Sequence, residues 1–467
     1  MSSTKFHGLN INNTLMIVID FIMIFVSFIL TLFCAKLFAS DFYLSYTNTD
    51  IYIQFFVFAL PLHFILLGVG LYNEKLREHF NGIIIRIFVA VLLTYLLVNF
   101  SSGVLSTGDF FPKSFNELLS VIAFLTLCNS RFISQRLGLN QIMKRRILVM
   151  GSGKRASIIE RCMRRKADRI GLEFVGFTSV TGDADKQIES EKVLNIREPL
   201  ESFVTNQCID EIVIAIDERR NNLPIEELLR LKKMGVQITD IIEFVERETG
   251  QVAVDFLNPS WFLFQNHRSK NLLRTSLYWL FNSLIAISIA LITFPIILLT
   301  ILAMKIEGGR HFPILYSQER VGLNGKTFSI YKFTSMRTDA EKNGIQWAQK
   351  NDPRVTKVGK FIRKFRIDEL PQLYNVIIGD MYFVGPRPER PQFTEGFSHS
   401  IPYYNQRHSV KPGLTGWAQL QYPYGSSEKD ALEKLKFDLY YIRNRNFTLD
   451  MLILLKTSEI ILFGKGR

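Results

Sequence analysis

Long apolar runs constrain this chain more than any other feature of its sequence. They lie at residues 15–33, 51–71, 83–100, 117–127 and 277–304. About 20 apolar residues suffice for an α-helix to cross the hydrocarbon core of a bilayer. The run at 117–127 is short and needs flanking residues to span. Because four runs fall in the first part of the chain, the sequence predicts a membrane protein with an N-terminal bundle of four transmembrane helices over residues 1–135.

The charges between the runs predict which side of the membrane each loop occupies. Cations are frequent between the second and third runs and after residue 131, and scarce in the other two loops, which hold Lys36 and Lys113. Loops rich in Lys and Arg stay in the cytoplasm, so the N-terminus and everything after residue 131 are expected there. The first run is too long for a signal-peptide core, so it is expected to remain as an anchor. Asp20, inside it, is a candidate functional acid, although a hydrogen bond within the bundle is favoured.

The overall charge and the cysteines narrow the class of partner. A formal net charge of +13 on a chain with membrane segments suits anionic lipids and phosphate-bearing substrates. The sequence contains no nucleic-acid motif, and a homo-oligomer is left open. The cysteines are widely scattered without metal-ligand spacing, and two of them lie in apolar segments, so no disulfide framework is expected. They are Cys34, Cys128, Cys162 and Cys208.

Residues 145–250 alternate strand-like apolar runs with helical patterns, which predicts a Rossmann-like, doubly wound parallel sheet. Gly151 and Gly153 follow the first strand, as in a dinucleotide-binding loop. However, Ala156 and Ser157 stand where the third glycine belongs, and no acidic residue follows the second strand at the ribose position. A structural or ligand-sensing domain without a catalytic nicotinamide is therefore expected. The alternative is a membrane-bound nucleotide-sugar oxidoreductase or dehydratase that uses the Gly151 loop.

A connector at residues 251–273 leads into the last long apolar run, 277–304, which contains Pro295. A proline inside a helix removes a hydrogen bond and bends the helix. A crossing helix would place the rest of the chain outside the cell, whereas a re-entrant helix broken near Pro295 keeps it in the cytoplasm. Cations on both sides of the run favour the re-entrant arrangement. A simple kinked span is the alternative.

Residues 354–366 combine apolar positions at three-to-four spacing with a basic opposite face. Such a helix suits a membrane interface, and the alternative is a surface helix packed on the domain core.

The segment at residues 366–390, RIDELPQLYNVIIGDMYFVGPRPER, points most directly to chemistry. Asp368 and Glu369 are adjacent carboxylates among cations. One can act as nucleophile or base, the other can hold a divalent cation, and guanidinium groups can neutralise phosphate oxygens. The alternative is an exposed acidic pair at a helix start. Further on, Pro386 and Pro388 hold Arg387 between rigid neighbours, which makes it a candidate phosphate or nucleotide clamp.

This segment resembles the signature of the bacterial sugar transferases, the polyprenyl-phosphate hexose-1-phosphate transferases. Residues 316–322, 328–337 and 411–419 resemble the family's opening strand, its lysine-containing strand and its late loop, in that order. The resemblance covers about residues 274–467, and it implies a C-terminal α/β monotopic catalytic domain there. The preceding apolar runs and Rossmann-like domain are as in its large members. The residues after Gln419 depart from the family's commoner Asn-Gly-Arg continuation, so the sugar is not predicted.

The resemblance implies transfer of a hexose-1-phosphate from a UDP-sugar to polyprenyl (undecaprenyl) phosphate with release of UMP. This would be the first membrane step of exopolysaccharide or related glycan assembly, in the bacterial inner membrane. Asp368 would be the nucleophile that forms an aspartyl phosphosugar intermediate, and Glu369 would ligate Mg²⁺. Lys332, Arg363 and Arg387 would contact phosphates.

Two further residues have weaker assignments. Asp380 is a candidate for supporting either the metal or its own loop. His408 precedes the 411–419 loop, and a structural role is favoured for it over a place in the site. A non-enzymatic scaffold is a third functional class, and the intact Asp-Glu and Pro-Arg-Pro motifs disfavour it.

Overall fold

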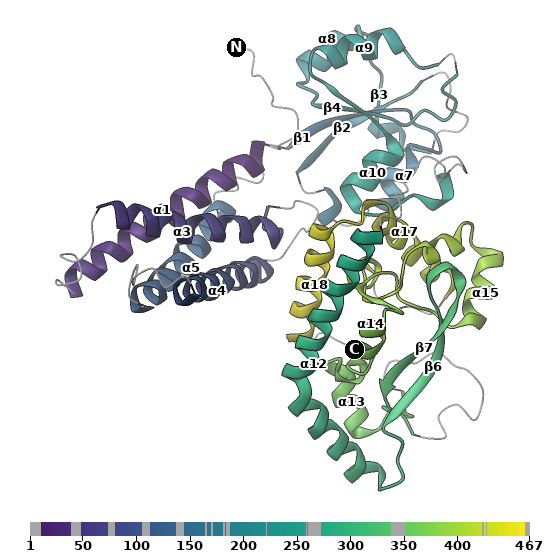
Figure 1. The fold of residues 1–467 in the computed structure, drawn as a ribbon. Coiled ribbons are helices and arrows are strands. Elements are labelled where there is room, and N and C mark those ends of the chain that lie inside the picture. The colour runs from purple at the N-terminus through teal and green to yellow at the C-terminus, as the bar shows by residue number, and fades with distance from the viewer. Residues whose placement is uncertain are drawn as a thin grey trace. The chain divides into compact units, whose positions relative to one another are not determined.

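The computed structural model separates the chain into two compact units, Met1–Phe256 and Leu257–Arg467 (Figure 1). The residues that it describes are 11–38, 48–72, 80–104, 113–136, 144–163, 166–169, 171–180, 183, 187–220, 222–257, 259, 272–337, 352–422, 425 and 427–462.

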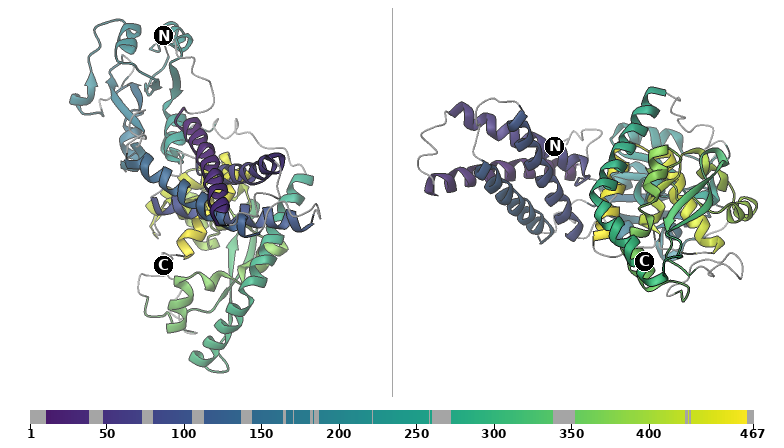
Figure 2. Two further views of the ribbon diagram at one scale, coloured as in Figure 1. Left: turned by 90° about the vertical axis from the view of Figure 1, so that its left-hand side faces the viewer. Right: turned by 60° about the horizontal axis from the view of Figure 1, so that its bottom comes forward.

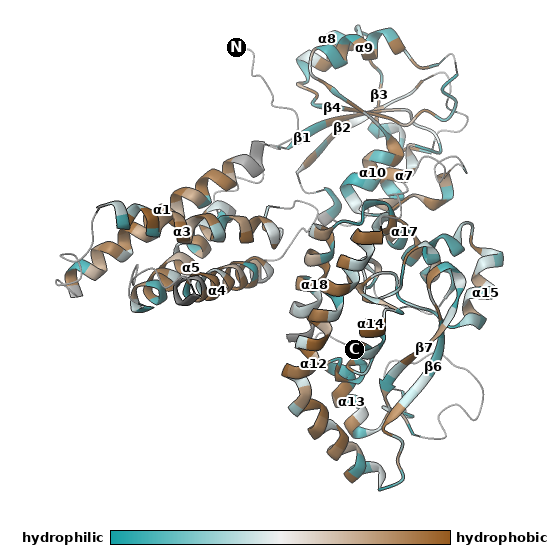
Figure 3. Cartoon of the chain, viewed as in Figure 1, coloured by the Kyte–Doolittle hydropathy of each residue, from teal (hydrophilic) through white to brown (hydrophobic). Residues whose placement is uncertain are grey.

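The first unit begins with apolar helices. In the described chain these are α1 (Ile11–Phe38), α3 (Asn48–Gly68), α4 (Phe80–Val104) and α5 (Lys113–Arg136). Each contains a stretch long and apolar enough to cross a membrane, and flanking residues extend the short fourth run to Lys113–Ser134. Apolar residues dominate these helices (Figure 3), and many large ones are exposed, as lipid contact requires. The chain is therefore a membrane protein, while the number of helices that cross stays a prediction.

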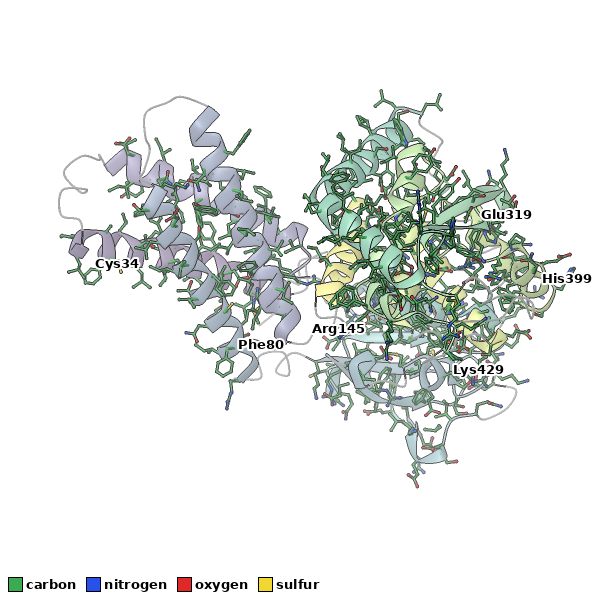
Figure 4. The ribbon with its side chains drawn as sticks, turned by 90° about the horizontal axis from the view of Figure 1, so that it is seen from below. Cys34, Phe80, Arg145, Glu319, His399 and Lys429 are labelled. Carbon is green, nitrogen blue, oxygen red and sulfur yellow. The ribbon has the colours of Figure 1, made fainter. Side chains whose placement is uncertain are left out.

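Asp20 of α1 finds partners within this bundle. Its side chain is fully buried, accepts a hydrogen bond from the Tyr72 hydroxyl (2.7 Å) and forms an ion pair with Arg131 of α5. An unpaired charge at membrane depth is costly, so the pair stabilises the contact between α1 and α5. The favoured reading of Asp20 as a bundle-internal partner is confirmed. The four cysteines are free, including Cys34 near the end of α1 (Figure 4).

The second part of this unit is a parallel sheet with strand order β3-β2-β1-β4-β5. The strands are β1 (Arg145–Met150), β2 (Leu172–Thr178), β3 (Val193–Leu194), β4 (Glu211–Ile214) and β5 (Gln237–Asp240), and the helices are α7 (Ser157–Cys162), α8 (Leu200–Asn206), α9 (Ile225–Lys233) and α10 (Ile241–Thr249).

Side chains of β1 alternate between two apolar cores, one on each face of the sheet. Ile147 and Val149 pack with residues of α7 and α10, whereas Leu148 and Met150 pack with residues of α8 and α9. Figure 1 shows the two helix pairs on opposite faces. This arrangement confirms the predicted doubly wound sheet, because a parallel sheet must be covered on both faces.

The boundary of this domain differs from the sequence prediction. Residues 251–256 were expected to open the connector, but Val252, Ala253 and Val254 are buried and Ala253 belongs to the core on the α7 and α10 face. Apolar side chains next to a packed helix gain stability by burial, and Phe256 also packs against this core, so the domain continues to Phe256.

The second unit is a mixed α/β domain that begins with a long apolar helix. Its elements include α12 (Leu272–Gly308), β6 (Leu315–Val321), β7 (Thr327–Phe333), α13 (Lys357–Lys364), η6 (Ile367–Glu369), α14 (Gln372–Ile378), β8 (Tyr382–Val384), α15 (Pro391–Ser400), η7 (Tyr404–Ser409), β9 (Gly413–Thr415), α16 (Trp417–Gln421), α17 (Glu428–Asn444) and α18 (Phe447–Leu462). Strands β6 and β7 pair antiparallel, and β8 pairs parallel with β9. The views of Figure 2 show these elements from two further sides.

Helix α12 continues through Pro295 as one element of 37 residues. A break in helical structure there is therefore not found; the surrounding turns keep their hydrogen bonds and a proline alone bends a helix. Figure 1 shows the ribbon changing direction between the half beside α18 and the half beside α13. Leu291 and Ile292, in the middle of the helix, are 71% and 77% exposed, as lipid contact requires.

Both halves of α12 pack on this one domain. Before Pro295, Trp279 Nε1 donates to the carbonyl of Ile377 in α14 (3.1 Å), and Asn282 Oδ1 accepts from the backbone N–H of Phe383 in β8 (3.0 Å). After Pro295, the helix contributes to an apolar cluster with β7 and α13. The buried members of that cluster are Met304, Phe333 and Ile362.

The basic amphipathic helix predicted at residues 354–366 is present as α13. Its apolar face is used mainly inside the protein, because Ile362 is 1% exposed and packs in the cluster with Met304. Phe361 is 59% exposed on the same helix. The alternative of a helix packed on the domain core thus describes α13 better than a membrane-interface helix does.

Candidate active site

The two adjacent carboxylates are buried, at the point where the chain turns from α13 to α14. Arg366 sits in the left-handed region at φ +58°, and this turn begins η6, which carries Asp368 and Glu369. Both acids are 8% exposed. A left-handed residue other than glycine costs about 1–2 kcal/mol, so the surrounding fold must hold the turn in place. The alternative of an exposed acidic pair is wrong.

Glu369 lies among three cations. Its Oε1 accepts from Arg387 Nη2 (3.0 Å), from Lys332 Nζ of β7 (3.2 Å) and from Arg366 Nη1 (3.3 Å). Burial alone would raise the pKa of Glu369, but the charges of Lys332, Arg387 and Arg366 outweigh it and hold that pKa well below its ordinary value. Glu369 is therefore ionised throughout the physiological range.

Asp368 has a different environment from its neighbour. Its Oδ1 is buried and has no hydrogen-bond partner among the described residues. Burial, together with the charge of Glu369, raises the pKa of Asp368 to about 6, and the charges of Lys332, Arg363 and Arg366 offset part of that rise. A buried carboxylate oxygen without a partner is uncommon and marks a candidate site for incoming chemistry.

Arg363 is held beside the acidic pair by a close helix–strand contact. Its Nε donates to Ser335 Oγ (2.8 Å), and Ser335 follows β7 in the chain. A Cβ on Gly359, one turn earlier in α13, would lie 2.1 Å from the Ser335 carbonyl oxygen, so only glycine permits this approach. The contact aligns α13 with β7 and thereby brings Arg363 and Lys332 to the same site.

The Pro-Arg-Pro segment is held against the 411–419 loop. Strand β8 leads into Gly385, whose N–H donates to the Thr415 carbonyl (2.9 Å). A Cβ on Gly413 would lie 2.1 Å from Gly385 N, so the two backbones touch directly. The three carbonyls of the segment all accept from the scaffold: Pro386 O from Gly413 N (3.0 Å), Arg387 O from Arg407 Nη2 (3.0 Å) and Pro388 O from Arg320 Nη1 (3.1 Å).

The fold therefore brings together the predicted residues Lys332, Arg363, Asp368, Glu369 and Arg387. Pro386 and Pro388 lie on either side of Arg387 and contribute backbone carbonyls to the scaffold. Pro295 is part of α12 and has no contact with the acidic pair that the structure records.

The two weaker candidates lie outside the acidic cluster. Asp380 accepts from Asn375 Nδ2 (3.4 Å), and the same amide donates to Ser329 O in β7 (2.8 Å), so Asp380 supports its loop. His408 is 8% exposed and packs edge-on against Tyr404. Burial and the charge of Arg407 lower the pKa of His408 to about 3, which keeps the ring neutral in the protein interior. This environment agrees with the structural role that the sequence favoured for His408.

Sequence reasoning did not single out Arg366 and Arg407. Arg366 opens the motif that contains the acidic pair, but its left-handed turn and its contact with Glu369 depend on the fold. Arg407 stands next to His408 in a segment that resembles the family, and this resemblance was the sequence signal that could have identified it. Its contact with Arg387 joins residues 20 positions apart.

A divalent cation fits the acidic pair. Among the described residues, no group of three His, Cys, Asp or Glu side chains could hold a metal ion by itself. Mg²⁺ is usually bound by one or two carboxylates together with substrate phosphates and water. The unpartnered Oδ1 of Asp368 and the ionised carboxylate of Glu369 match that pattern.

The glycine loop of the parallel-sheet domain is occupied by the protein's own carboxylate. Asp217 accepts from the backbone N–H groups of Lys154 (2.9 Å) and Arg155 (2.7 Å), and a Cβ on Gly153 would lie 2.1 Å from Asp217 Oδ2. In a dinucleotide-binding loop, such N–H groups face the pyrophosphate. Here a carboxylate takes the anionic position.

Comparison with known proteins agrees with the site. Residues 273–464 match the Bacterial sugar transferase family. A UDP-N-acetylgalactosamine-undecaprenyl-phosphate N-acetylgalactosaminephosphotransferase of Aeromonas hydrophila is 40% identical over 243 residues, which are 51% of this chain and 55% of that protein. An undecaprenyl-phosphate glucose phosphotransferase of Komagataeibacter xylinus is 29% identical over 353 residues, 74% of this chain and 64% of that protein. The aligned regions thus span less than two thirds of these relatives.

A smaller relative is matched over nearly its whole length. The exopolysaccharide production protein PSS of Rhizobium leguminosarum bv. phaseoli is 38% identical over 194 residues, which are 40% of this chain and 96% of that protein. With the acidic pair, its cationic neighbours and the Pro-Arg-Pro segment assembled in one domain, these matches show that the chain belongs to the bacterial sugar transferase family.

Proposed function

We propose that this protein transfers a sugar-1-phosphate from a UDP-sugar to polyprenyl phosphate and releases UMP. The observation that carries the proposal is the buried Asp368 carboxylate, whose Oδ1 lacks a partner among the described residues, beside a Glu369 neutralised by three cations. The family membership of the domain and the names of its relatives support the same reaction class. The product would enter exopolysaccharide or related glycan assembly.

The reaction proceeds in two displacements at one phosphorus. An Asp368 oxygen attacks the phosphate that bears the sugar, the bond from that phosphorus to the bridging oxygen breaks, and UMP leaves with the bridging oxygen. The resulting aspartyl phosphosugar is then attacked by an oxygen of polyprenyl phosphate. A new diphosphate forms, and Asp368 leaves as a carboxylate. Carboxylate nucleophiles of this kind divide a difficult transfer into two easier steps.

In this proposal, the cations around Glu369 neutralise the charge of the substrate phosphates. Lys332, Arg366 and Arg387 meet at one carboxylate oxygen, so their charges are concentrated beside the nucleophile. The charge of Arg363 also contributes to the electrostatic environment of Asp368. Phosphoryl transfer depends mainly on positioning and charge neutralisation. Bound Mg²⁺, held by Glu369 and substrate phosphates, would supply further neutralisation of the developing charge.

We infer that α12 is re-entrant and that the catalytic domain is cytoplasmic. The helix is about 55 Å long, enough to cross a bilayer and extend beyond it. A straight crossing would carry its two halves to opposite sides of the membrane. Yet Trp279 before Pro295 and Met304 after it both pack on the same domain. A helix that enters and returns satisfies both contacts and leaves the site with the nucleotide-sugar pool.

The parallel-sheet domain has no catalytic role in this proposal. Asp217 on the glycine loop gives no support to the alternative of a nicotinamide-dependent oxidoreductase or dehydratase, because an anion already faces the N–H groups that would bind pyrophosphate. The Rhizobium relative, matched over 96% of its length by 194 residues, supports a self-sufficient transferase domain. A chain without residues 1–260 is therefore expected to retain Mg²⁺-dependent UMP release in membranes. Activity that returned only with that region and NAD would contradict this division.

The decisive test is UMP release by the purified full-length protein with polyprenyl phosphate, Mg²⁺ and single UDP-sugars. UDP-N-acetylgalactosamine is the first donor to test, because the Aeromonas relative is named for it, and UDP-glucose is the second. Asp368→Asn should abolish release, and brief incubation of the wild type with donor labelled in the phosphate next to the sugar should label the protein. Wild-type turnover by Asp368→Asn would refute the covalent route.

A further inference from the structure

We propose that Arg407 is a positioning residue that holds Arg387 in place beside the acidic pair. Arg407 is 4% exposed, and its Nη2 donates to the Arg387 carbonyl (3.0 Å). The side chain of Arg387 in turn donates to Glu369 Oε1 (3.0 Å). The inference rests on the proposed function, because it assigns Arg407 a task only if Arg387 and Glu369 take part in catalysis.

Arg407 is itself fixed by a buried carboxylate from a distant helix. Asp438 of α17 is 2% exposed, and its Oδ2 accepts from both Nε (3.1 Å) and Nη2 (2.8 Å) of Arg407. The remaining arm, Nη1, donates to the Tyr404 hydroxyl (2.9 Å). The planar guanidinium therefore has its orientation set at every nitrogen. Arg407 and Asp438 therefore form a rigid buried ion pair and not a flexible surface pair.

The sequence around Arg387 explains why an outside anchor is needed. The preceding and following residues are both prolines, which lack a backbone N–H and restrict the chain to an extended form. Arg387 precedes a proline and is therefore restricted to extended backbone, and its carbonyl accepts from a side chain outside the segment. Among the three carbonyls of Pro386, Arg387 and Pro388, the central one receives the charged donor that Asp438 fixes.

The buried Arg407–Asp438 ion pair connects α17 to the acidic pair through three contacts. Asp438 orients Arg407, Arg407 holds the backbone of Arg387, and Arg387 reaches Glu369 with its side chain. A displacement of about 1 Å in a positioned group can cost about a hundredfold in rate. Arg407 can thus influence turnover although its own recorded contacts are with Tyr404, Arg387 and Asp438.

A double-mutant cycle between Arg407→Lys and Arg387→Ala tests this proposal. Lysine keeps the positive charge near Asp438 but lacks the planar fork, so it does not fix Asp438, the Tyr404 hydroxyl and the Arg387 carbonyl in one rigid arrangement. We expect UMP release by Arg407→Lys to fall about ten- to hundredfold, with a raised Mg²⁺ requirement like that of Arg387→Ala. Once Arg387 is alanine, the lysine substitution should have little additional effect on turnover.

Two further variants separate positioning from damage to the fold. Asp438→Asn keeps an acceptor oxygen beside Arg407. We expect it to cause a smaller loss of UMP release, and we expect that loss to disappear in the Arg387→Ala background. Glu433→Gln removes an ion pair with Lys436 elsewhere on α17 and should leave turnover unchanged. If Arg407→Lys does not fold, the Asp438→Asn cycle decides the question alone.

The outcomes distinguish this proposal from the proposed function. Multiplicative losses in the cycles, or turnover unaffected by Arg407→Lys and Asp438→Asn, would overturn the positioning role. A wild-type protein and a Glu433→Gln control that release no UMP from any donor would instead refute the transferase activity.

Discussion

Asp368 and Glu369 are neighbours of equal charge, yet neutralising each should change stability in opposite directions. Burial disfavours the ionised form of Asp368 and raises its pKa from 3.8 to about 6. At pH 8 the ionised group therefore costs the folded state about 3 kcal/mol relative to an unperturbed aspartate. Asp368→Asn has nearly the same shape without the charge, so it should stabilise the protein by up to about 3 kcal/mol while abolishing turnover.

The pH dependence of this gain follows from the direction of the shift. A raised folded-state pKa means that the folded protein holds the proton more tightly, so stability is lost as pH rises from the unfolded pKa through about 6. The stabilisation by Asp368→Asn should be about 3 kcal/mol at pH 8 and about 1 kcal/mol at pH 4.5. For a domain of this size each kcal/mol moves Tm by about 2–4 °C.

Glu369→Gln is the matched comparison. The pKa of Glu369 is lowered, so its ionised form stabilises the fold above its unfolded pKa, and that stability is lost as pH falls. Its removal leaves Lys332, Arg366 and Arg387 facing one another, and breaking such a buried pair typically costs about 3–5 kcal/mol.

Thermal unfolding in detergent with EDTA measures both effects without bound metal. The expected result at pH 8 is a higher Tm for Asp368→Asn and a lower Tm for Glu369→Gln than for wild type. Equal decreases in Tm for the two variants would refute the assignment of opposite environments to the two acids.

Three other predictions concern the site and the membrane topology. The acid limb of kcat/KM for UMP release should show an ionisation near pH 6 at limiting Mg²⁺ and move to lower pH at saturating Mg²⁺, because a bound dication favours the Asp368 carboxylate; a limb independent of Mg²⁺ would contradict this. Arg366→Gly and Arg366→Ala remove the same charge, but glycine tolerates φ +58°, so the free energy of unfolding should be about 1 kcal/mol higher for Arg366→Gly than for Arg366→Ala. Equal free energies of unfolding would mean that the turn relaxes in Arg366→Ala. In a cysteine-free background, Glu395→Cys should resist a membrane-impermeant thiol reagent added to intact cells, whereas Lys113→Cys should react; labelling at residue 395 would exclude a cytoplasmic site.

Local sequence patterns were sufficient to predict the elements and the candidate residues. The apolar runs predicted helices such as α1 and α12, since apolar length reflects the thickness of the bilayer directly. Alternating strands and helices predicted the parallel sheet with its two cores. The Asp368-Glu369 pair and the Pro-Arg-Pro segment indicated the site because its residue types are those that phosphate chemistry requires.

The tertiary structure decided what each of these residues contacts. Opposite environments for Asp368 and Glu369 arise because Lys332 and Arg387, distant in sequence, both reach Glu369. Asp217 follows β4, and it reaches the glycine loop after β1 because β4 pairs with β1, so an incomplete motif alone could not show this contact.

The same distinction holds for α13 and for Arg407. Periodicity shows that a helix has an apolar face, but whether that face meets lipid or protein depends on the neighbour that packs against it, here α12. Likewise, an arginine beside a histidine carries no local sign that it holds a carbonyl 20 residues away. Sequence alone determined periodicity, charge and backbone restriction, because these are local; pairing and burial were decided by the fold, because they join distant parts of the chain.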